Sequence, residues 1–343
     1  MIRFAALLIA FLPNIPFAAE PADPLFANQE PLALQLNGPF ERIDNERDKE
    51  QEYEGSISYV NENGDTVTLD AEFSVRGNWR LQKQNCAYSQ LWVNLKRGQV
   101  PGTLFENQNR LKLVVQCRRQ DRYGDLIQKE YLAYKLFEEL SDIHFDTRLV
   151  DATYQDSEEG DTRSHRAFFI EHQNRIADRF GLEEVEDNTV AIDSLDAEQA
   201  TRTALFMFML GNTDFSLRSG PEGEECCHNA KLFRSAGGKL FPVPYDFDAS
   251  GFVDAPYAPD PAPSLGISSN KRRVYRGYCA HQATVPGIVA EARQSQQASL
   301  ALFDAAGLEG RAARSTRNFL LDFYELLEDE EDVEDDIVQQ CRG

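Results

Sequence analysis

The spacing of apolar residues changes near the middle of the chain, and this change constrains the fold more than any other feature. Residues 31–120 contain short segments in which β-branched and aromatic residues alternate or cluster, such as SISYV, TVTLDAEFSVRG, LWVNLK and RLKLVV. From about residue 172 onward, apolar residues recur at helical spacing, as in SLDAEQATRTALFMFML. Because strands come first and helices second, the sequence predicts an α+β protein with two unlike halves.

One helix interrupts the β-rich half. Residues 125–140 (DLIQKEYLAYKLFEEL) have a period of 3.6 and predict a helix, and strands are expected after it around 147–154 and 166–171. We therefore predict a β-rich N-terminal lobe over 31–171 and a helical C-terminal lobe over 172–343. A cleft between two such halves is a natural place for a ligand.

The N-terminus has the pattern of a secretory signal. Arg3 precedes an apolar stretch over 4–12, and the small residues Ala18 and Ala19 follow. We expect a signal peptide over 1–19, a linker rich in proline and alanine over 20–30, and an exported protein in the periplasm or outside the cell. An uncleaved anchor is the alternative. No other apolar run approaches membrane length, so no transmembrane span is expected after cleavage.

The cysteine content agrees with export. The chain has six cysteines, and an even number in an exported protein favours disulfide bonds. Cys86 and Cys117 lie near two strands expected in one sheet, so this pair is expected to bridge first. Cys226 and Cys227 are adjacent, and a bond between neighbours is strained and uncommon. No C-x2-C pair is present, which argues against a zinc framework.

Charge excludes one class of partner. The net charge is -22 at pH 7, and no basic stripe offsets it, so nucleic-acid binding is not expected. Much of the negative charge lies in residues 325–336, of which nine of twelve are acidic. This run predicts a solvated acidic tail or a frayed helix end, and a role in binding cations or a partner is the alternative.

A segment of the helical half carries the residues that point to chemistry. Residues 210–251 contain Asp214, then His228 and Asn229, then Asp246 and Asp248 after the apolar run LFPVPY. In phosphoryl transfer one carboxylate orients the attacking hydroxyl, while an amide and a second carboxylate hold the metal ion on the nucleotide phosphates. The order of residues here suits that chemistry.

The β-rich half supplies the matching cation. Lys112 lies in the apolar strand RLKLVV, and Glu130 lies on the helix that follows. A strand lysine held by a helix glutamate is the device with which kinases place an ammonium on phosphates. Arg76, in the Arg-Gly-Asn sequence after another strand, is a further candidate for phosphate contact. No Walker motif and no glycine-rich nucleotide loop is present.

These motifs together resemble a family. The sequences RGNWR, RLKLV, KEYLAYKLFEEL, FFIE and GNTD…HN…VPYDFD, spread over residues 70–255, resemble the CotH-type secretory kinases. More distantly they resemble the HipA-type kinases, and exported bacterial proteins with GNTD and PYDFD segments are also similar. The resemblance implies a two-lobed protein-kinase-like fold, with a β-rich N-terminal lobe and a helical C-terminal lobe. It also implies ATP and Mg2+ (or Mn2+) as cofactors.

The resemblance also implies roles for single residues. Lys112 would contact the phosphates, Glu130 would hold Lys112, and Asp214 would be the catalytic carboxylate. Glu171 would lie at the crossover between the lobes, near the nucleotide base. Asn229 and Asp246 would bind the metal ion, and Asp248 would be a further ligand of the metal.

The sequence leaves three functions open. The first is an exported atypical kinase that transfers a phosphoryl or nucleotidyl group to an unknown acceptor. The second is a catalytically inactive binding protein of the cell envelope. The third is a metal-dependent hydrolase that uses Asp214, Asp246 and Asp248 without nucleotide, which a Lys112 far from Asp246 would favour.

Overall fold

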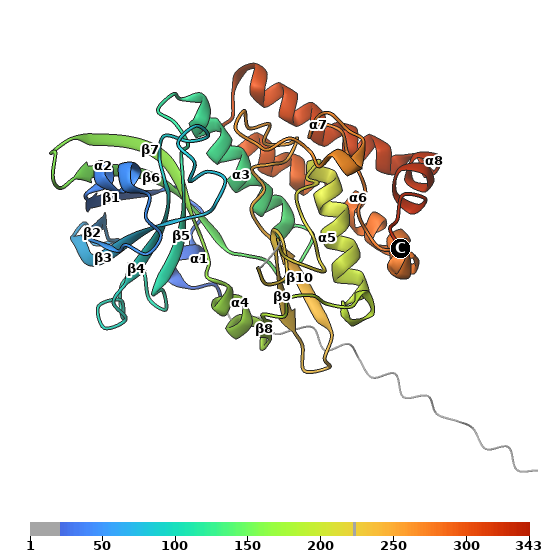
Figure 1. Cartoon of the computed structure of the whole chain (residues 1–343), viewed down its shortest axis with the longest axis horizontal. Helices are drawn as coiled ribbons and strands as arrows, with labels where there is room; N and C mark the ends of the chain where they lie inside the picture. The colour runs from blue at the N-terminus through green and yellow to red at the C-terminus, as the bar shows by residue number, and fades with distance from the viewer. Residues whose placement is uncertain (1–20, 222–223) are drawn as a thin grey trace, which may run out of the picture.

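The computed structural model describes residues 21–221 and 224–343, so the expected signal peptide over 1–19 lies outside the described residues. Strands dominate the first half and helices the second (Figure 1). The strands are β1 (Leu32–Gly38), β2 (Tyr53–Val60), β3 (Thr66–Arg76), β4 (Gln90–Leu95), β5 (Arg110–Val115), β6 (Thr147–Asp156), β7 (Thr162–Ile170), β8 (Glu183–Val185), β9 (Ala230–Arg234) and β10 (Leu240–Pro244). The main helices are α1 (Pro24–Ala27), α2 (Phe40–Glu46), α3 (Arg122–Glu138), α4 (Gln173–Phe180), α5 (Ala197–Leu210), α6 (Val285–Ala305), α7 (Gly310–Glu328) and α8 (Glu330–Val333).

The first seven strands form a closed barrel in the order β1-β2-β3-β4-β5-β7-β6. Closure depends on β1, which pairs antiparallel with β2 and parallel with β6, so that Leu32 lies opposite Val150. The expectation of a two-lobed kinase-like fold is therefore wrong, because that fold has an open sheet in its N-terminal lobe. The sequence patterns located strands, but they carried no information on the pairing that joins β1 to β6.

The alternation of side chains along the strands fills the barrel. Leu32, Leu34 and Leu36 of β1 are buried while their neighbours Ala33 and Gln35 are exposed, as expected for a strand with one face on a core. Large buried rings complete the interior, namely Phe73, Phe105, Tyr154 and Phe169. The barrel is thus a packed core of its own, as expected for a small barrel.

Helix α3 joins the barrel to the helical half (Figure 1). On the barrel side, Tyr134 contacts Phe168 of β7, with ring centroids 5.6 Å apart. On the other side, Phe137 contacts Phe206 of α5 at 4.8 Å, and Tyr134 contacts Phe247 at 4.6 Å. Because one helix packs against both units, its position fixes the barrel relative to the loop after β10.

Helix α5 delivers the Asp214 loop. Its first turn is capped by Asp196, whose carboxylate accepts a hydrogen bond from the Gln199 backbone N–H. It ends at Gly211, which has a φ of 61° and lies against the Asn270 carbonyl, where an added Cβ would approach to 2.8 Å. A glycine is needed there, because a side chain would be both strained and too close. The chain leaves the helix directly before Asn212.

A second, three-stranded sheet has the order β10-β9-β8. Strand β9 starts directly after Asn229, and β10 ends two residues before Asp246. Because β9 and β10 are antiparallel, with Ala230 opposite Pro244, the residue before one strand and the residues after the other are neighbours. This hairpin therefore places the amide and the carboxylates of the 210–251 segment together.

Three disulfides bridge all six cysteines, and the predicted Cys86–Cys117 bond is confirmed. The other two join Cys226 to Cys227 and Cys279 to Cys341. Disulfides are typical of exported proteins. Within the described residues, none of the helices has the length and apolar character needed to cross a bilayer.

The expected linker and the acidic run both contain helices. The expected linker over 20–30 includes α1, with Leu25 and Phe26 buried against the barrel. The acidic run over 325–336 spans the end of α7, helix α8 and the start of a π-helical turn over Glu334–Val338. Val333 and Ile337 are buried, because their apolar side chains recur at helical spacing among the acids.

Candidate functional site

The candidate site lies where the outer face of the barrel meets the β9–β10 hairpin. Lys112 is on β5 between Leu111 and Leu113, which point into the barrel, so alternation points Lys112 outward. Its ammonium lies 4.4 Å from the ring centroid of Tyr245. The Tyr245 backbone N–H in turn donates to the carbonyl of Asn229, at 3.1 Å. A residue of the barrel thus reaches the 210–251 segment.

Asp214, His228 and Asn229 form the exposed part of the site. The Oδ1 of Asp214 is 2.8 Å from Nε2 of His228, and its Oδ2 accepts from Nδ2 of Asn229 at 3.2 Å. The side chains of Asp214 and His228 are 42% and 36% exposed. The hydrogen bond that Asp214 accepts from His228 raises the pKa of His228. A carboxylate and a histidine in this arrangement can accept and release a proton at the surface.

The Asp214 loop is ordered by a buried amide. Asn212 is fully buried, and its Oδ1 accepts from the Asp214 backbone N–H at 2.9 Å. The Asn229 amide also donates to the Asp214 carbonyl at 2.6 Å. These bonds fix the backbone on both sides of the carboxylate, so its direction is set by the fold.

Arg80 is the centre of the buried part of the site. It is 3.3 Å from Glu130, 3.2 Å from Asp246 and 2.9 Å from Asp248. One guanidinium cannot neutralise three carboxylates. Accordingly, burial raises the pKa of Asp248 and of Glu130, with Arg80 opposing the shift in each case.

This arrangement changes the role expected for Glu130. The sequence predicted that Glu130 holds Lys112, but the structure pairs Glu130 with Arg80 instead. Arg80 belongs to the RGNWR sequence, which was noted without a role for this residue. One feature of the sequence could have indicated Arg80. Several acidic residues were expected at one place, and buried carboxylates require a cation nearby.

Among residues 21–221 and 224–343, no carboxylate contacts the buried ammonium of Lys112. Its ammonium lies among the rings of Tyr245, Trp92 and Phe145, at 4.4, 5.7 and 5.8 Å. Burial lowers its pKa to about 7, and the charge of Arg76 acts in the same direction. Such an ammonium would gain charge stabilisation from any anion that reached it.

The backbone at the two expected metal ligands is unusual. Asp246 and Asn229 have φ values of 62° and 51°, in the left-handed region that asparagine and aspartate tolerate best. The N–H of Asp246 donates to the hydroxyl of Tyr134 on α3, at 3.0 Å. The aspartate is therefore held by the same helix that carries Glu130.

Arg76 also faces the site. It is the last residue of β3, and its guanidinium lies 5.9 Å from the ring centroid of Trp92. Burial lowers its pKa, while the charge of Asp246 opposes that effect. Arg76 and Lys112 therefore form a cationic edge beside the carboxylates.

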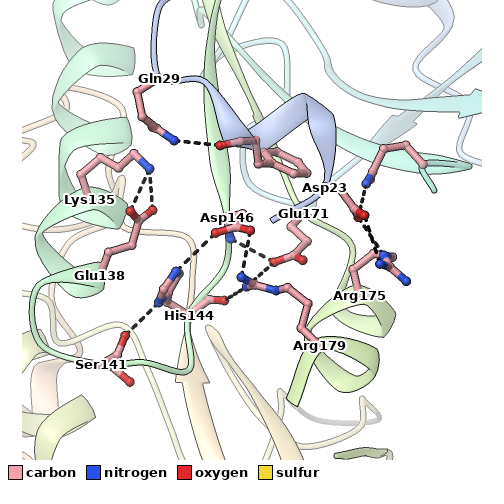
Figure 2. A network of polar contacts seen from close by, with 12 residues as sticks. Asp23, Gln29, Lys135, Glu138, Ser141, His144, Asp146, Glu171, Arg175 and Arg179 are labelled. Carbon is pink, nitrogen blue, oxygen red and sulfur yellow. Dashed lines mark hydrogen bonds and ion pairs between the residues drawn. The ribbon is translucent and has the colours of Figure 1, made fainter. Parts of the chain in front are cut away.

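Glu171 is not part of this arrangement. It follows β7 and belongs to a separate buried network, in which Arg179 binds both Glu171 and Asp146 at 2.9 Å (Figure 2). The carboxylate of Glu171 also accepts from the Asp146 backbone N–H at 3.0 Å. Its polar atoms are occupied by the chain itself.

That network also contains the one group in the described ranges whose histidine and acidic side chains are close enough to share a metal ion. Its members, Glu138, His144 and Asp146, have ligand atoms within 4.8 Å of one another. Lys135 is 2.7 Å from Glu138 and Arg179 is 2.9 Å from Asp146, so cations already hold the carboxylates (Figure 2). Asp214, Asp246 and Asp248 do not converge as closely, and Asp248 is engaged by Arg80.

A cavity lies in another part of the protein. A cavity of about 970 Å3 opens at one end of the barrel, between β6, β7 and the start of α3, with Tyr88, Tyr154 and His165 in its wall. None of the predicted site residues lines it. The candidate site is therefore identified by the chemistry of its side chains and not by the size of a cavity.

A scan against protein-family models finds no match to this sequence, and a search of curated proteins finds no similar one. The resemblance to the CotH-type kinases thus stays a prediction that depends on short motifs. Function has to be inferred from the residues at the site.

Proposed function

We propose that the protein is an exported phosphotransferase of the periplasm or the extracellular space, which transfers a phosphoryl group from ATP to a hydroxyl acceptor with Mg2+ as cofactor. One observation carries the proposal. The buried ammonium of Lys112, which no carboxylate of the described residues contacts, lies beside the segment that carries Asp214, Asn229 and Asp246. Phosphoryl transfer requires a cation for the phosphates, a metal site and a carboxylate for the acceptor in one place.

The donor set fits a hard divalent cation. Asn229 donates through Nδ2, which leaves its Oδ1 as a ligand atom, and the Asp246 side chain is 36% exposed. Glu130, Asp246 and Asp248 all lie within 3.3 Å of the one guanidinium of Arg80, so a cation beside Asp246 would add to the neutralisation of these carboxylates. Mg2+ prefers oxygen ligands of this kind, and it would supply neutralisation of phosphate charge when bound.

The cationic edge would bind the nucleotide. Lys112 and Arg76 lie on the barrel side of Asp246, where both would contact phosphate oxygens. A bound phosphate would replace the missing anionic partner of Lys112 and raise its pKa from about 7. Nucleotide binding is therefore expected to take up a proton near neutral pH.

Asp214 would act on the acceptor. The acceptor oxygen forms a bond to the terminal phosphorus, and the bond to ADP breaks with its electron pair on the ADP oxygen. The hydroxyl proton passes to Asp214, whose Oδ1 is hydrogen-bonded to His228. Both residues are exposed enough for an acceptor to reach them.

The position of Lys112 also separates the alternatives. A hydrolase that uses only the three aspartates has no need of a lysine among them, and it would be favoured by a Lys112 far from Asp246. Lys112 instead contacts Tyr245, the residue before Asp246. A binding protein without catalysis would share the nucleotide site and differ in the absence of transfer.

Thermal unfolding of the mature chain tests the nucleotide site. A ligand that binds the folded state alone raises the midpoint by mass action. We expect a rise with ATP and Mg2+ together, a smaller one with ATP alone, and no metal-dependent rise in Asp246→Asn. Asp260→Asn, an exposed aspartate in the proline-rich loop, is the control and should respond like the parent. Equal midpoints with and without Mg-ATP would exclude the proposal.

A further inference from the structure

Three arginines lie beside Asp214 and have no assigned role. We call Arg218, Arg276 and Arg342 the arginine cluster. Arg276 donates to the carbonyl of Thr213, the residue before Asp214, and its guanidinium lies 5.1 Å from the ring centroid of Phe215. The cluster thus touches the loop that carries the proposed catalytic carboxylate.

Tyr278 lies near the other two members of the cluster. Arg342 lies over the ring of Tyr278, 5.6 Å from its centroid. Burial raises the pKa of Tyr278, and the charges of Arg342, Arg218 and Arg276 all oppose this rise. The three arginines are therefore close enough to one phenol for each charge to act on it.

A disulfide fixes Arg342 in this position. The preceding residue, Cys341, is bonded to Cys279, and Arg342 is hydrogen-bonded through its backbone to Gly277 and Cys279 at 2.8 and 2.9 Å. Arg276 and Tyr278 belong to the same stretch. The Cys279–Cys341 bond thus holds an arginine from the end of the chain next to the Asp214 loop.

The cluster lacks carboxylate partners. Over residues 21–221 and 224–343, none of the three arginines forms an ion pair. Burial and then the charge of Arg342 lower the pKa of Arg276, and Asp214 gives only a smaller opposing effect. The chain has 57 acidic and 35 basic residues, so three arginines beside one loop form a local excess of positive charge on an acidic protein.

We propose that the acceptor is an acidic peptide segment, whose oxyanions bind the arginine cluster while its hydroxyl reaches Asp214. This inference rests on the proposed function. A guanidinium binds carboxylates and phosphates through paired hydrogen bonds, so both groups suit the site. A peptide fits because an extended chain can place anionic side chains on both sides of one serine or threonine.

Binding of labelled peptides to the mature chain, measured by fluorescence anisotropy without nucleotide, tests the inference. Each peptide has a single serine, flanked by glutamate, by phosphoserine, by glutamine or by lysine. We expect at least one anionic peptide to bind about tenfold more tightly than the glutamine peptide, and the lysine peptide to bind most weakly. Preference for glutamate would identify carboxylates as the recognised groups, and preference for phosphoserine would identify phosphates.

Variants locate the binding to the cluster. Arg218→Ala and Arg342→Ala should each weaken the anionic peptide by about three- to tenfold, while Arg342→Lys retains part of the affinity because it keeps the charge. Arg314→Ala, an exposed arginine on α7 without an ion pair, is the matched control and should bind like the parent. Unchanged affinity in both alanine variants, or equal affinity for the glutamate and glutamine peptides, would overturn the inference.

The two proposals fail in different ways. If Mg-ATP raises the unfolding midpoint but anionic peptides bind no better than the glutamine peptide, the acidic acceptor is excluded and the phosphotransferase proposal stands. Peptide binding without any Mg-ATP shift would leave an acidic-peptide site on a protein that is not a kinase.

Discussion

Two polar clusters in this protein each contain a histidine and two carboxylates but differ in exposure. The closed cluster consists of His144, Asp146, Glu171 and Arg179, and the open cluster consists of Asp214, His228, Asn229 and Asp246. The side chains of Glu171 and Arg179 are 1% and 5% exposed, whereas those of Asp214 and Asp246 are 42% and 36% exposed. In the closed cluster each carboxylate is held by the chain, and in the open cluster atoms remain for a ligand.

The difference in exposure indicates a structural role for the closed cluster and a functional role for the open cluster. The closed cluster ties α4 to the ends of β6 and β7, so its charges stabilise a junction of the barrel (Figure 2). The open cluster contributes little to packing but gathers carboxylates and an amide near a buried lysine. Closeness of acidic and histidine side chains alone would have favoured the closed cluster as the site. Exposure and incomplete pairing indicate the open one.

The largest effect on stability is expected from a substitution that breaks the closed cluster. Arg179→Ala would leave Glu171 and Asp146 buried without their cation, and we expect a loss of about 3–5 kcal/mol in the free energy of unfolding. Urea denaturation of the mature chain measures it. The control is Arg317→Ala, which removes an exposed pair with Asp304 and should cost about 0–1 kcal/mol. Equal losses in the two variants would show that the closed cluster is not a structural unit.

The second prediction concerns the open cluster. Asp214→Asn keeps the shape of the side chain but removes its ability to take a proton, so we expect kcat to fall by about 10²–10⁴-fold. The urea midpoint should change little, because the carboxylate is exposed. A loss of stability as large as that of Arg179→Ala would contradict the contrast between the clusters.

The third prediction concerns Lys112. Its pKa is lowered by burial from 10.5 to about 7 in the folded chain. Between these pH values the unfolded chain binds more protons, so stability should rise with pH across this window. Lys112→Met should remove that rise, on the order of 2–4 kcal/mol, and abolish nucleotide binding. Unfolding curves at pH 7 and pH 10 measure it, and an unchanged slope in the variant would count against a desolvated lysine.

The smallest effect is expected at His228. Its pKa is raised by the hydrogen bond to Asp214, so the pair stabilises the fold fully below the unfolded pKa of 6.5. This contribution is lost as pH rises through the folded pKa. An NMR titration of the ring should give a pKa above 6.5 that returns toward this value in Asp214→Asn. A pKa that does not respond to the substitution would mean that the two side chains are not paired in solution.

The sequence located the local elements of the barrel but not its closure. The segments SISYV and TVTLDAEFSVRG are in β2 and β3, and the hairpin turn at Asn63–Gly64 joins them. These signals depend on residues that are close in the chain. Pairing of β1 with β6 depends on contacts between distant segments, and no periodicity within either strand specifies its partner.

The residues proposed for the site come together through two different contacts. Asn229 and Asp246 flank the β9–β10 hairpin, and Asp214 is hydrogen-bonded to Asn229. The predicted pairing of Glu130 with Lys112 was wrong, because Glu130 pairs with Arg80 instead. Arg80 lies in the loop after β3, and a loop has no regular spacing of side chains from which their direction could be predicted. Glu171 was expected near the site, but Arg179, eight residues later, draws it into the closed cluster.

The parallel pairing of β1 with β6 has a consequence for how the chain folds. Leu32 cannot reach its place opposite Val150 until every strand between them is available, so the barrel has no stable form made from its first strands alone. Long-range pairing of this kind slows folding and leaves strand edges unprotected for longer. Strand β7 lies between β5 and β6 in the barrel, so the barrel stays open until Ile170 has been made, and until then the chain can pass through a narrow channel. The late closure of the barrel would thus suit passage through a membrane before folding.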